Sequence, residues 1–216
     1  MFCQVNGIRL YYEVSGEGPA LIMVHGNTES HAIFDVALRD LSPHYRVYTV
    51  DSRCHGSSTK NVPLSYDLMA EDMIQFIRAM DLKEPAFYGF SDGGIIGLKI
   101  ALAEPELLGK LIVSGANLNP GGLKASVLLT YRLFSLSGDP MYKMVVTEPR
   151  IPVSDLKAIR VPTVVLAGTK DMVRTAHTME IAAAIPGALL ELLPGETHGS
   201  YIVHSEKLGP LLQKYL

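Results

Sequence analysis

Several features that would mark other classes of protein are scarce in this sequence. Only two of its 216 residues are cysteines, Cys3 and Cys54, and they form no spacing typical of a disulfide framework or a zinc site. We therefore expect two reduced thiols rather than a disulfide, and no bound metal.

Long apolar runs are also missing. The longest, such as Ala20 to Val24, have the length of a strand and are far too short to cross a bilayer. The opening residues, MFCQVNG, contain neither a basic segment nor a long apolar one, so we predict no signal peptide. These absences favour a cytoplasmic protein without a membrane partner.

The sequence has no excess of positive charge. Its 19 lysines and arginines stand against 22 aspartates and glutamates, a formal net charge of −3, which offers no basic surface for nucleic acid. Apolar residues, by contrast, are plentiful: 48% of the residues are hydrophobic and 19% are charged, as in globular domains. We expect one domain, residues 1–216, with a substantial core.

The order of the apolar segments predicts an α/β fold. The strands Phe2–Val5 and Ile8–Val14 flank Asn6-Gly7, a strong signal for an antiparallel hairpin. Short continuous apolar runs then suit strands that are buried on both faces of a parallel sheet. These runs are Ala20–Val24, Arg46–Val50, Pro85–Tyr88, Lys110–Val113, Pro162–Ala167 and Ala188–Leu193.

Longer amphipathic segments alternate with these runs and predict helices. They cover residues 31–41, 66–81, 92–103, 175–185 and 201–216. The alternation indicates a doubly wound, mostly parallel sheet with an N-terminal antiparallel hairpin, right-handed crossovers and helices on both faces.

Residues 116–155 break this alternation, because they are longer than an ordinary connection between strands. Within them, Leu123 to Leu136 is predicted to be a helix that is apolar on nearly all sides. We expect a short lid whose apolar surface is partly buried by a second subunit in a homodimer. Ordinary packing against the sheet edge is the simpler expectation for most of its large apolar side chains, which include Leu123, Val127, Leu133, Phe134 and Met141.

Ser91 is the most informative residue of the sequence. It lies in Gly89-Phe90-Ser91-Asp92-Gly93-Gly94, between a predicted strand and a predicted helix. A serine hydroxyl becomes a good nucleophile only when it is exposed, held in a strained turn and served by a base. Gly89 and Gly93 lack the Cβ atoms that would crowd such a turn. Gly-x-Ser-x-Gly also occurs by chance, but this context favours a nucleophile elbow.

A second glycine turn, His25-Gly26-Asn27, follows the strand Ala20–Val24. In a doubly wound sheet, ligands bind where the carboxyl ends of adjacent strands meet. We therefore predict an oxyanion hole made by the backbone amides of Asn27 and Asp92, with Gly26 shaping the turn. The alternative is a structural turn. The side chain of Asp92 is placed to cap the helix over residues 92–103.

The catalytic acid must orient a histidine, and Asp171 is the best placed aspartate. It follows the strand Pro162–Ala167 in Gly168-Thr169-Lys170-Asp171. Asp51 also ends a strand, but it precedes the serine and is interpreted as a structural anchor of its loop. Asp139 is a further competitor within residues 116–155.

Seven histidines compete for the role of base. Six have other predicted places: His31 and His177 in helices, His44 in a turn, His55 in a loop of small residues, His25 in the oxyanion loop and His204 in the last helix. His198, in Gly195-Glu196-Thr197-His198-Gly199-Ser200, follows the last strand. The order Ser91, Asp171, His198 is the one expected after a nucleophile elbow.

With these residues identified, the sequence resembles the α/β-hydrolase fold superfamily over essentially its whole length. The elbow, Ser114-Gly115-Ala116-Asn117 and the Asp171 and His198 loops are most similar to the valacyclovir hydrolase (biphenyl hydrolase-like) group and related small carboxylesterases. Residues 51–58 resemble the family's Asp-x-Arg-Gly-x-Gly-x-Ser loop, with Cys54 in place of its glycine. The family usually inserts a multi-helix cap where this chain has only residues 116–155.

The triad and the resemblance imply a serine hydrolase that cleaves small carboxylic esters through an acyl-enzyme, without a metal or an organic cofactor. A serine at position 91 argues against epoxide hydrolases and haloalkane dehalogenases, which place a carboxylate there. Hydrolysis of thioesters or amides and perhydrolysis stay open, as does a ligand receptor that keeps the triad but turns over slowly. The acyl and alcohol parts of the substrate cannot be read from the sequence.

Overall fold

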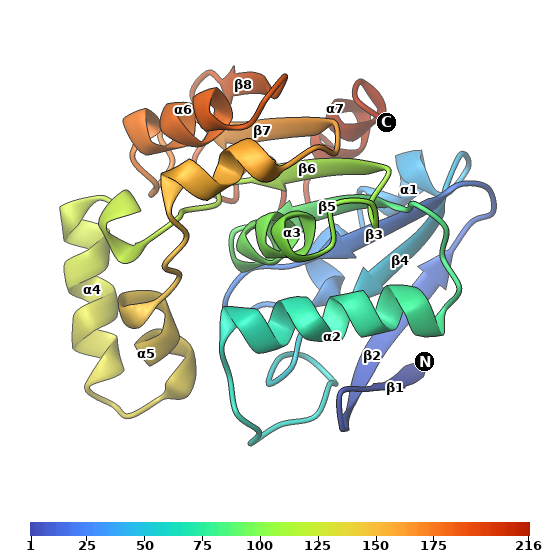
Figure 1. The fold of residues 1–216 in the computed structure, drawn as a ribbon, viewed down its shortest axis with the longest axis horizontal. Coiled ribbons are helices and arrows are strands. Elements are labelled where there is room, and N and C mark those ends of the chain that lie inside the picture. Colours follow the sequence, from blue (N-terminus) through green and yellow to red (C-terminus); the bar gives the residue numbers. More distant parts are fainter.

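Eight strands form one sheet through the centre of the molecule, in the order β1-β2-β4-β3-β5-β6-β7-β8 (Figure 1). The computed structural model describes residues 1–216. The strands are β1 (Phe2–Val5), β2 (Ile8–Ser15), β3 (Ala20–Val24), β4 (Arg46–Val50), β5 (Ala86–Phe90), β6 (Lys110–Ser114), β7 (Thr163–Gly168) and β8 (Leu189–Leu193).

The direction of the strands confirms the predicted fold class. β1 and β2 pair antiparallel, with Val5 opposite Ile8, and β2 pairs antiparallel with β4. All other neighbouring strands are parallel. Asn6 and Gly7 both have positive φ, 45° and 75°, as the tight hairpin turn requires.

Helices cover both faces of the sheet, and the strands alternate their side chains between two apolar layers. In β3, Ile22 belongs to the layer that includes helices α2 (Tyr66–Ala79), α3 (Asp92–Ala103) and α6 (Thr175–Ala184). Leu21 and Met23 belong to the other layer, with α1 (Leu38–Leu41) and α7 (Leu208–Gln213). Burial on both faces explains the continuous apolar runs of the inner strands. The last run is an exception, because β8 lies at the edge of the sheet and its Leu189 and Leu190 are exposed.

Two predicted helices are shorter than expected. Residues 31–41 form a 3-10 turn, η1 (His31–Phe34), and the single turn α1, with a non-helical turn over residues 35–37 between them. Of residues 201–216 only α7 is an α-helix. His204 has φ 49°, which no α-helix accommodates, so it lies in the turn before α7.

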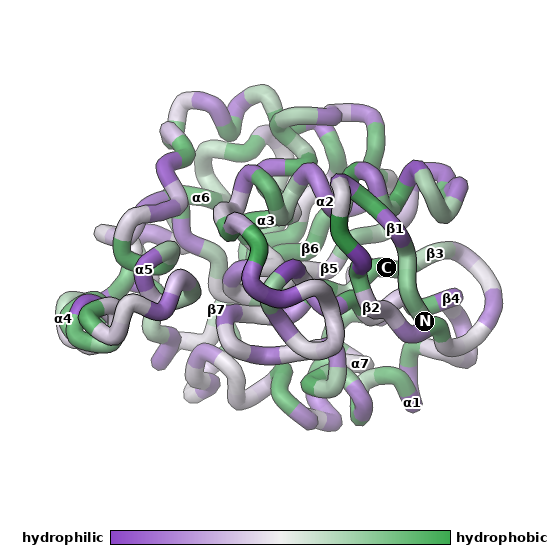
Figure 2. Tube along the Cα trace, turned by 90° about the horizontal axis from the view of Figure 1, so that it is seen from below, coloured by the Kyte–Doolittle hydropathy of each residue, from purple (hydrophilic) through white to green (hydrophobic).

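Residues 116–155 contain the 3-10 turns η2 (Pro120–Gly122) and η3 (Val153–Ala158) and the helices α4 (Ala125–Ser135) and α5 (Pro140–Thr147). The two α-helices form a hairpin that projects beside the sheet (Figure 1). Although α4 carries many apolar residues, visible in Figure 2, none of its residues is buried. Leu123 is buried as expected, whereas Leu133 and Phe134 are exposed.

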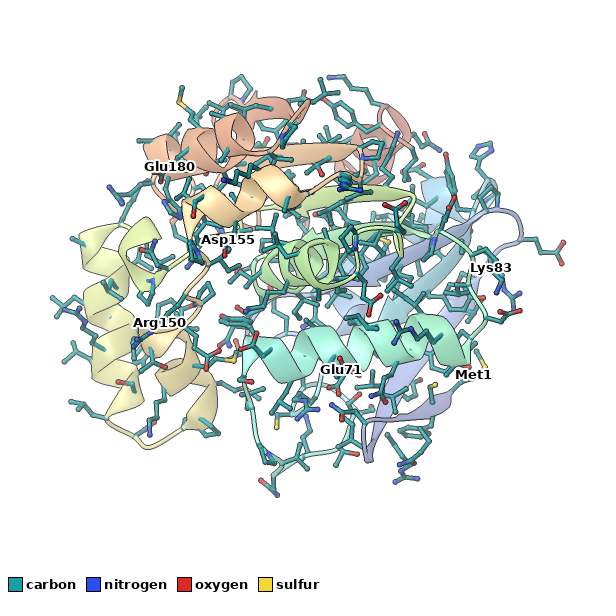
Figure 3. The ribbon with its side chains drawn as sticks, viewed as in Figure 1. Met1, Glu71, Lys83, Arg150, Asp155 and Glu180 are labelled. Carbon is teal, nitrogen blue, oxygen red and sulfur yellow. The ribbon has the colours of Figure 1, made fainter.

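The remaining surface carries many charged side chains beside a few exposed apolar ones, such as Phe2 and Leu189. The charged side chains labelled in Figure 3, those of Glu71, Lys83, Arg150, Asp155 and Glu180, are exposed. No helix combines the length and the apolar character needed to span a lipid bilayer. Cys3 and Cys54 are free and buried.

Candidate active site

Ser91 forms the whole turn between β5, which ends at Phe90, and α3, which begins at Asp92. Its backbone has φ 52° and ψ −110°, a conformation that costs a non-glycine residue about 1–3 kcal/mol. The Ser91 N–H donates to the Ser114 carbonyl at 2.8 Å, and this bond to the neighbouring strand β6 helps to hold the strained turn.

Of the glycines singled out in the sequence, Gly89 and Gly93 lie where a side chain would collide with backbone, and Gly26 lies where it would crowd other side chains. A Cβ at Gly89 would be 2.1 Å from the Gly93 carbonyl oxygen, and a Cβ at Gly93 would be 2.1 Å from the Val24 carbonyl oxygen. A Cβ at Gly26 would lie 3.1 Å from Ser91 Cβ. The close approach of the two loops therefore depends on all three glycines.

The structure brings Ser91, His198 and Asp171 together from three different loops. His198 Nε2 lies 3.0 Å from Ser91 Oγ, and His198 Nδ1 lies 2.7 Å from Asp171 Oδ1. Asp171 is 1% exposed and also accepts the Val173 N–H at 2.8 Å, which fixes its carboxylate. These distances are those of a nucleophile, a base and an orienting acid.

The imidazole of His198 is held by close packing as well as by Asp171. The Phe90 ring lies 4.9 Å from it, centroid to centroid. On another side is Gly115, where a Cβ would be 2.7 Å from His198 Cε1 and 2.9 Å from Nδ1. Gly115, which the sequence marks only through the resemblance, therefore leaves room for the His198 ring.

The backbone amides of Asn27 and Asp92 donate no hydrogen bond within the protein, so both are free to face a ligand. The Asp92 side chain does not cap α3 as expected. Its Oδ2 accepts from Asn27 Nδ2 at 3.0 Å, and its Oδ1 accepts from the Tyr66 hydroxyl at 2.7 Å. Burial raises the pKa of the Asp92 carboxyl, while these two bonds lower it.

The rival acids have structural roles. Asp51 accepts from the backbone amides of His31 and Ser57, each at 2.7 Å, and so anchors its loop as predicted. Asp139 caps α5 through the Met141 N–H. Cys54, which stands at the family's glycine position, keeps a positive φ of 64° that glycine would adopt more easily.

Two buried histidines also serve the fold. His25 Nε2 accepts the Ser52 N–H at 3.1 Å while Nδ1 bonds the Gly26 carbonyl, and burial lowers the pKa of its imidazole. His177 Nε2 accepts the Leu118 N–H at 3.0 Å at the base of the insertion. Both rings therefore act as neutral structural groups.

A pocket of about 220 Å³ opens at Ser91 and contains residues that the sequence did not single out. It is lined by Gly26, Asn27, Thr28, Glu29, Phe90, Ser91, Tyr131, Met172 and His198. Glu29 lies two residues after Asn27 in the same loop, and this position could have marked it in the sequence as a residue of the pocket. Tyr131 comes from α4, and no local pattern shows that this helix reaches the site.

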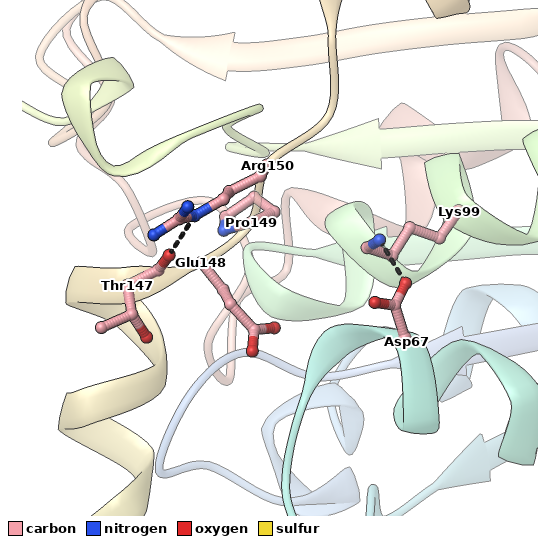
Figure 4. Close-up of a pocket in the computed structure, with 6 residues that line it drawn as sticks. All are labelled: Asp67, Lys99, Thr147, Glu148, Pro149 and Arg150. Carbon is pink, nitrogen blue, oxygen red and sulfur yellow. Dashed lines mark hydrogen bonds and ion pairs between the residues drawn. The ribbon is translucent and has the colours of Figure 1, made fainter.

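A second pocket of about 340 Å³ is polar and lies between the end of α5 and helices α2 and α3 (Figure 4). It contains none of the triad residues. Its lining pairs Lys99 with Asp67, and the Arg150 guanidinium donates to the Thr147 carbonyl. Because this pocket has no nucleophile served by a base, it does not compete with the one at Ser91.

The strand order and the geometry at Ser91 define an alpha/beta hydrolase. The family profile described as alpha/beta hydrolase fold matches residues 19–138, more than half of the chain, and the chain belongs to this family. The expected family is thereby confirmed.

Among relatives of known name is the pimeloyl-[acyl-carrier protein] methyl ester esterase of Aliivibrio fischeri (strain MJ11). It is 36% identical over 103 residues, which make up 48% of this chain and 38% of the esterase. The match thus spans well under two thirds of that relative. Its name fits the small-esterase group that the sequence resembles.

Solved structures agree on the fold. A meta-cleavage product hydrolase from Pseudomonas fluorescens IP01 (CumD) superposes with a TM-score of 0.84 at 18% identity, covering 99% of this chain and 96% of that one. The enol-lactonase from Burkholderia xenovorans LB400 has a TM-score of 0.81, also at 18% identity, covering 99% and 98%. At such identities the likeness shows the fold alone.

Proposed function

We propose that this protein is a serine hydrolase that cleaves small carboxylic esters through an acyl-enzyme intermediate. The observation that carries the proposal is the position of His198, within hydrogen-bond distance of both Ser91 Oγ and Asp171 Oδ1. Membership of the alpha/beta hydrolase family and the esterase among its relatives support the same reaction class.

In the proposed reaction, Ser91 Oγ attacks the ester carbonyl carbon while His198 Nε2 accepts the hydroxyl proton. Asp171 holds the imidazole tautomer and stabilises the imidazolium. The amides of Asn27 and Asp92 donate to the oxyanion of the tetrahedral intermediate. His198 then protonates the leaving alcohol, and later takes a proton from the water that releases the acyl group and restores Ser91.

Labelling and turnover together test the proposal. A fluorophosphonate should label Ser91 and abolish hydrolysis of p-nitrophenyl butyrate, and Ser91→Ala should lower kcat by more than about 10⁴-fold. Ser154→Ala is the matched control, because Ser154 lies on the surface in the insertion and its hydroxyl contacts only Asp155. It should keep both activity and labelling.

Wild type and Ser91→Ala should also be assayed for hydrolysis of a thioester and an amide and for perhydrolysis, because the same catalytic groups serve those reactions. Saturable ester turnover that disappears in Ser91→Ala supports the proposal. Fluorophosphonate that leaves Ser91 unlabelled contradicts the nucleophile assignment. Tight ligand binding with negligible turnover would instead indicate a receptor.

A further inference from the structure

A buried carboxylate lies directly beneath the proposed oxyanion hole. Asp92 is 3% exposed and forms no ion pair with a lysine or arginine. A buried acid without a cation is costly to the fold unless hydrogen bonds compensate it. Two such bonds are present, from the side chains of Asn27 and Tyr66.

The bond from Asn27 to Asp92 connects the two loops that carry the proposed donors, and the bond from Tyr66 ties Asp92 to helix α2. Asn27 follows β3 and Asp92 follows β5, so the two amides belong to separate loops. Asn27 Nδ2 donates to Asp92, while Asn27 Oδ1 is buried and has no hydrogen-bond partner, so Asp92 is the only partner of this side chain. One further bond, from the Gly93 N–H to the His25 carbonyl at 3.1 Å, joins the loops beside this point.

Tyr66 extends the network toward the insertion. It is the first residue of α2, is 1% exposed, and its own N–H donates to Glu148 Oε2 at 3.0 Å. Glu148 directly follows α5, and Figure 4 shows its carboxylate reaching from the end of that helix toward α2. A continuous series of hydrogen bonds therefore runs from Glu148 through Tyr66 and Asp92 to Asn27.

We propose that Asp92, Tyr66 and Asn27 are positioning residues that hold the two backbone amides in place to receive the oxyanion. The inference rests on the proposed function. Oxyanion donors act only when they are already oriented about 2.7–3.1 Å from the charge that develops. If one of these hydrogen bonds is lost, the loop must reorient during the reaction. This lowers kcat more than it weakens substrate binding.

The test compares p-nitrophenyl butyrate with its thionoester, in which sulfur replaces the carbonyl oxygen. Sulfur accepts hydrogen bonds poorly, so the thionoester gains less from a well-placed donor than the oxygen ester does. In Asn27→Ala and Tyr66→Phe, kcat for the oxygen ester should fall about 10-fold, with KM changed less than about twofold. The ratio of oxygen-ester to thionoester kcat should fall by a similar factor.

Tyr88→Phe is the matched control, since it also removes a buried tyrosine hydroxyl, here bonded to Ser114 Oγ at 3.1 Å. It should leave the oxygen-to-sulfur ratio unchanged. Asn27 lies on a partly exposed loop, so Asn27→Ala keeps the test valid if Tyr66→Phe fails to fold.

The outcomes separate the two proposals. A wild-type protein that hydrolyses neither ester and escapes fluorophosphonate overturns the proposed function, and the positioning role with it. Suppose instead that the wild type is active and Asn27→Ala keeps the wild-type ratio of oxygen-ester to thionoester kcat, or loses activity toward both esters equally. Either result overturns the positioning role alone.

Discussion

At the scale of single residues, Ser91 shows how the fold sustains a conformation that the residue itself disfavours. Its φ of 52° is strained for serine, and the turn persists because β5, α3 and the bond to Ser114 determine it. The glycine motif was readable from the sequence. The contacts that support the strain were not, because Ser114 belongs to the next strand along the chain.

Glu29 is a residue of the pocket whose negative charge the fold disfavours. Burial raises the pKa of its carboxyl above the ordinary 4.5, although the Gly26 N–H donates to it and His198 lies near. A Cβ at Gly26 would lie 2.7 Å from Glu29 Oε2 and 3.1 Å from Ser91 Cβ. Glu29 Oε2 and Ser91 Cβ are therefore within about 6 Å of each other, a range over which charges shift pKa values, so this carboxylate lies beside the site.

Glu29→Gln should raise the thermal midpoint at neutral pH. Because the folded pKa is raised, folded wild type binds more protons than unfolded wild type between pH 4.5 and that folded value, so its stability falls as pH rises through this window. Glutamine keeps the acceptor for Gly26 but carries no charge. Thermal unfolding from pH 4 to pH 8 should show a variant advantage that shrinks toward zero below pH 4.5.

Glu17→Gln, in an exposed turn, is the control and should track wild type across the same pH range. A Glu29→Gln advantage that stays constant with pH would contradict the electrostatic explanation.

At the scale of elements, sequence patterns located the strands and the helices that pack on them. The predicted helix over residues 92–103 has the bounds of α3, since its apolar residues and its flanking turn are local signals. Residues 31–41 and 201–216 contain apolar residues at helical spacing too. There, the pattern marks only short pieces of helix, η1, α1 and α7, and the positive φ of His204 keeps that residue out of α7.

The packing of α3 against β3 gives an element-scale prediction. Gly93→Ala would place a methyl 2.1 Å from the Val24 carbonyl oxygen, a backbone atom that cannot move without displacing the loop that begins at His25. We expect a loss of about 1–3 kcal/mol or more in the free energy of unfolding, measured by urea denaturation, together with loss of activity.

Gly121→Ala is the comparison for this change. A methyl there would meet only the flexible Asn119 side chain, at 3.0 Å, and the position has no positive φ. If the two variants are equally stable, the short distance to the Val24 carbonyl oxygen is not the reason for glycine at position 93.

At the scale of the whole molecule, the insertion is the least packed part of the fold. The exposed fractions of Leu129, Leu133, Phe134 and Leu136 on and after α4 are 58%, 59%, 51% and 81%. Leu129, Leu133 and Leu136 follow helical spacing and form one apolar stripe. Tyr131 lies on the opposite side of α4 and lines the pocket at Ser91, so α4 contributes one side chain to this pocket.

The stripe supports the predicted homodimer, in which a second copy covers this face. Light scattering coupled to gel filtration should give a mass near twice the 23.5 kDa of the chain. The double variant Leu133→Gln, Leu136→Gln should be monomeric yet still folded, because both side chains are exposed in the single chain. A monomeric wild-type profile at high concentration would rule the dimer out.

The sequence by itself determined the order Ser91, Asp171, His198, because each lies directly after an apolar strand and such signals are local. Only the tertiary structure decided the 3.0 Å and 2.7 Å contacts that join them, and the presence of Glu29 and Tyr131 in the pocket. It also decided that the Asp92 side chain bonds Asn27 in the neighbouring loop instead of capping α3. These features depend on distances between segments far apart in the chain, which packing of the sheet and helices sets.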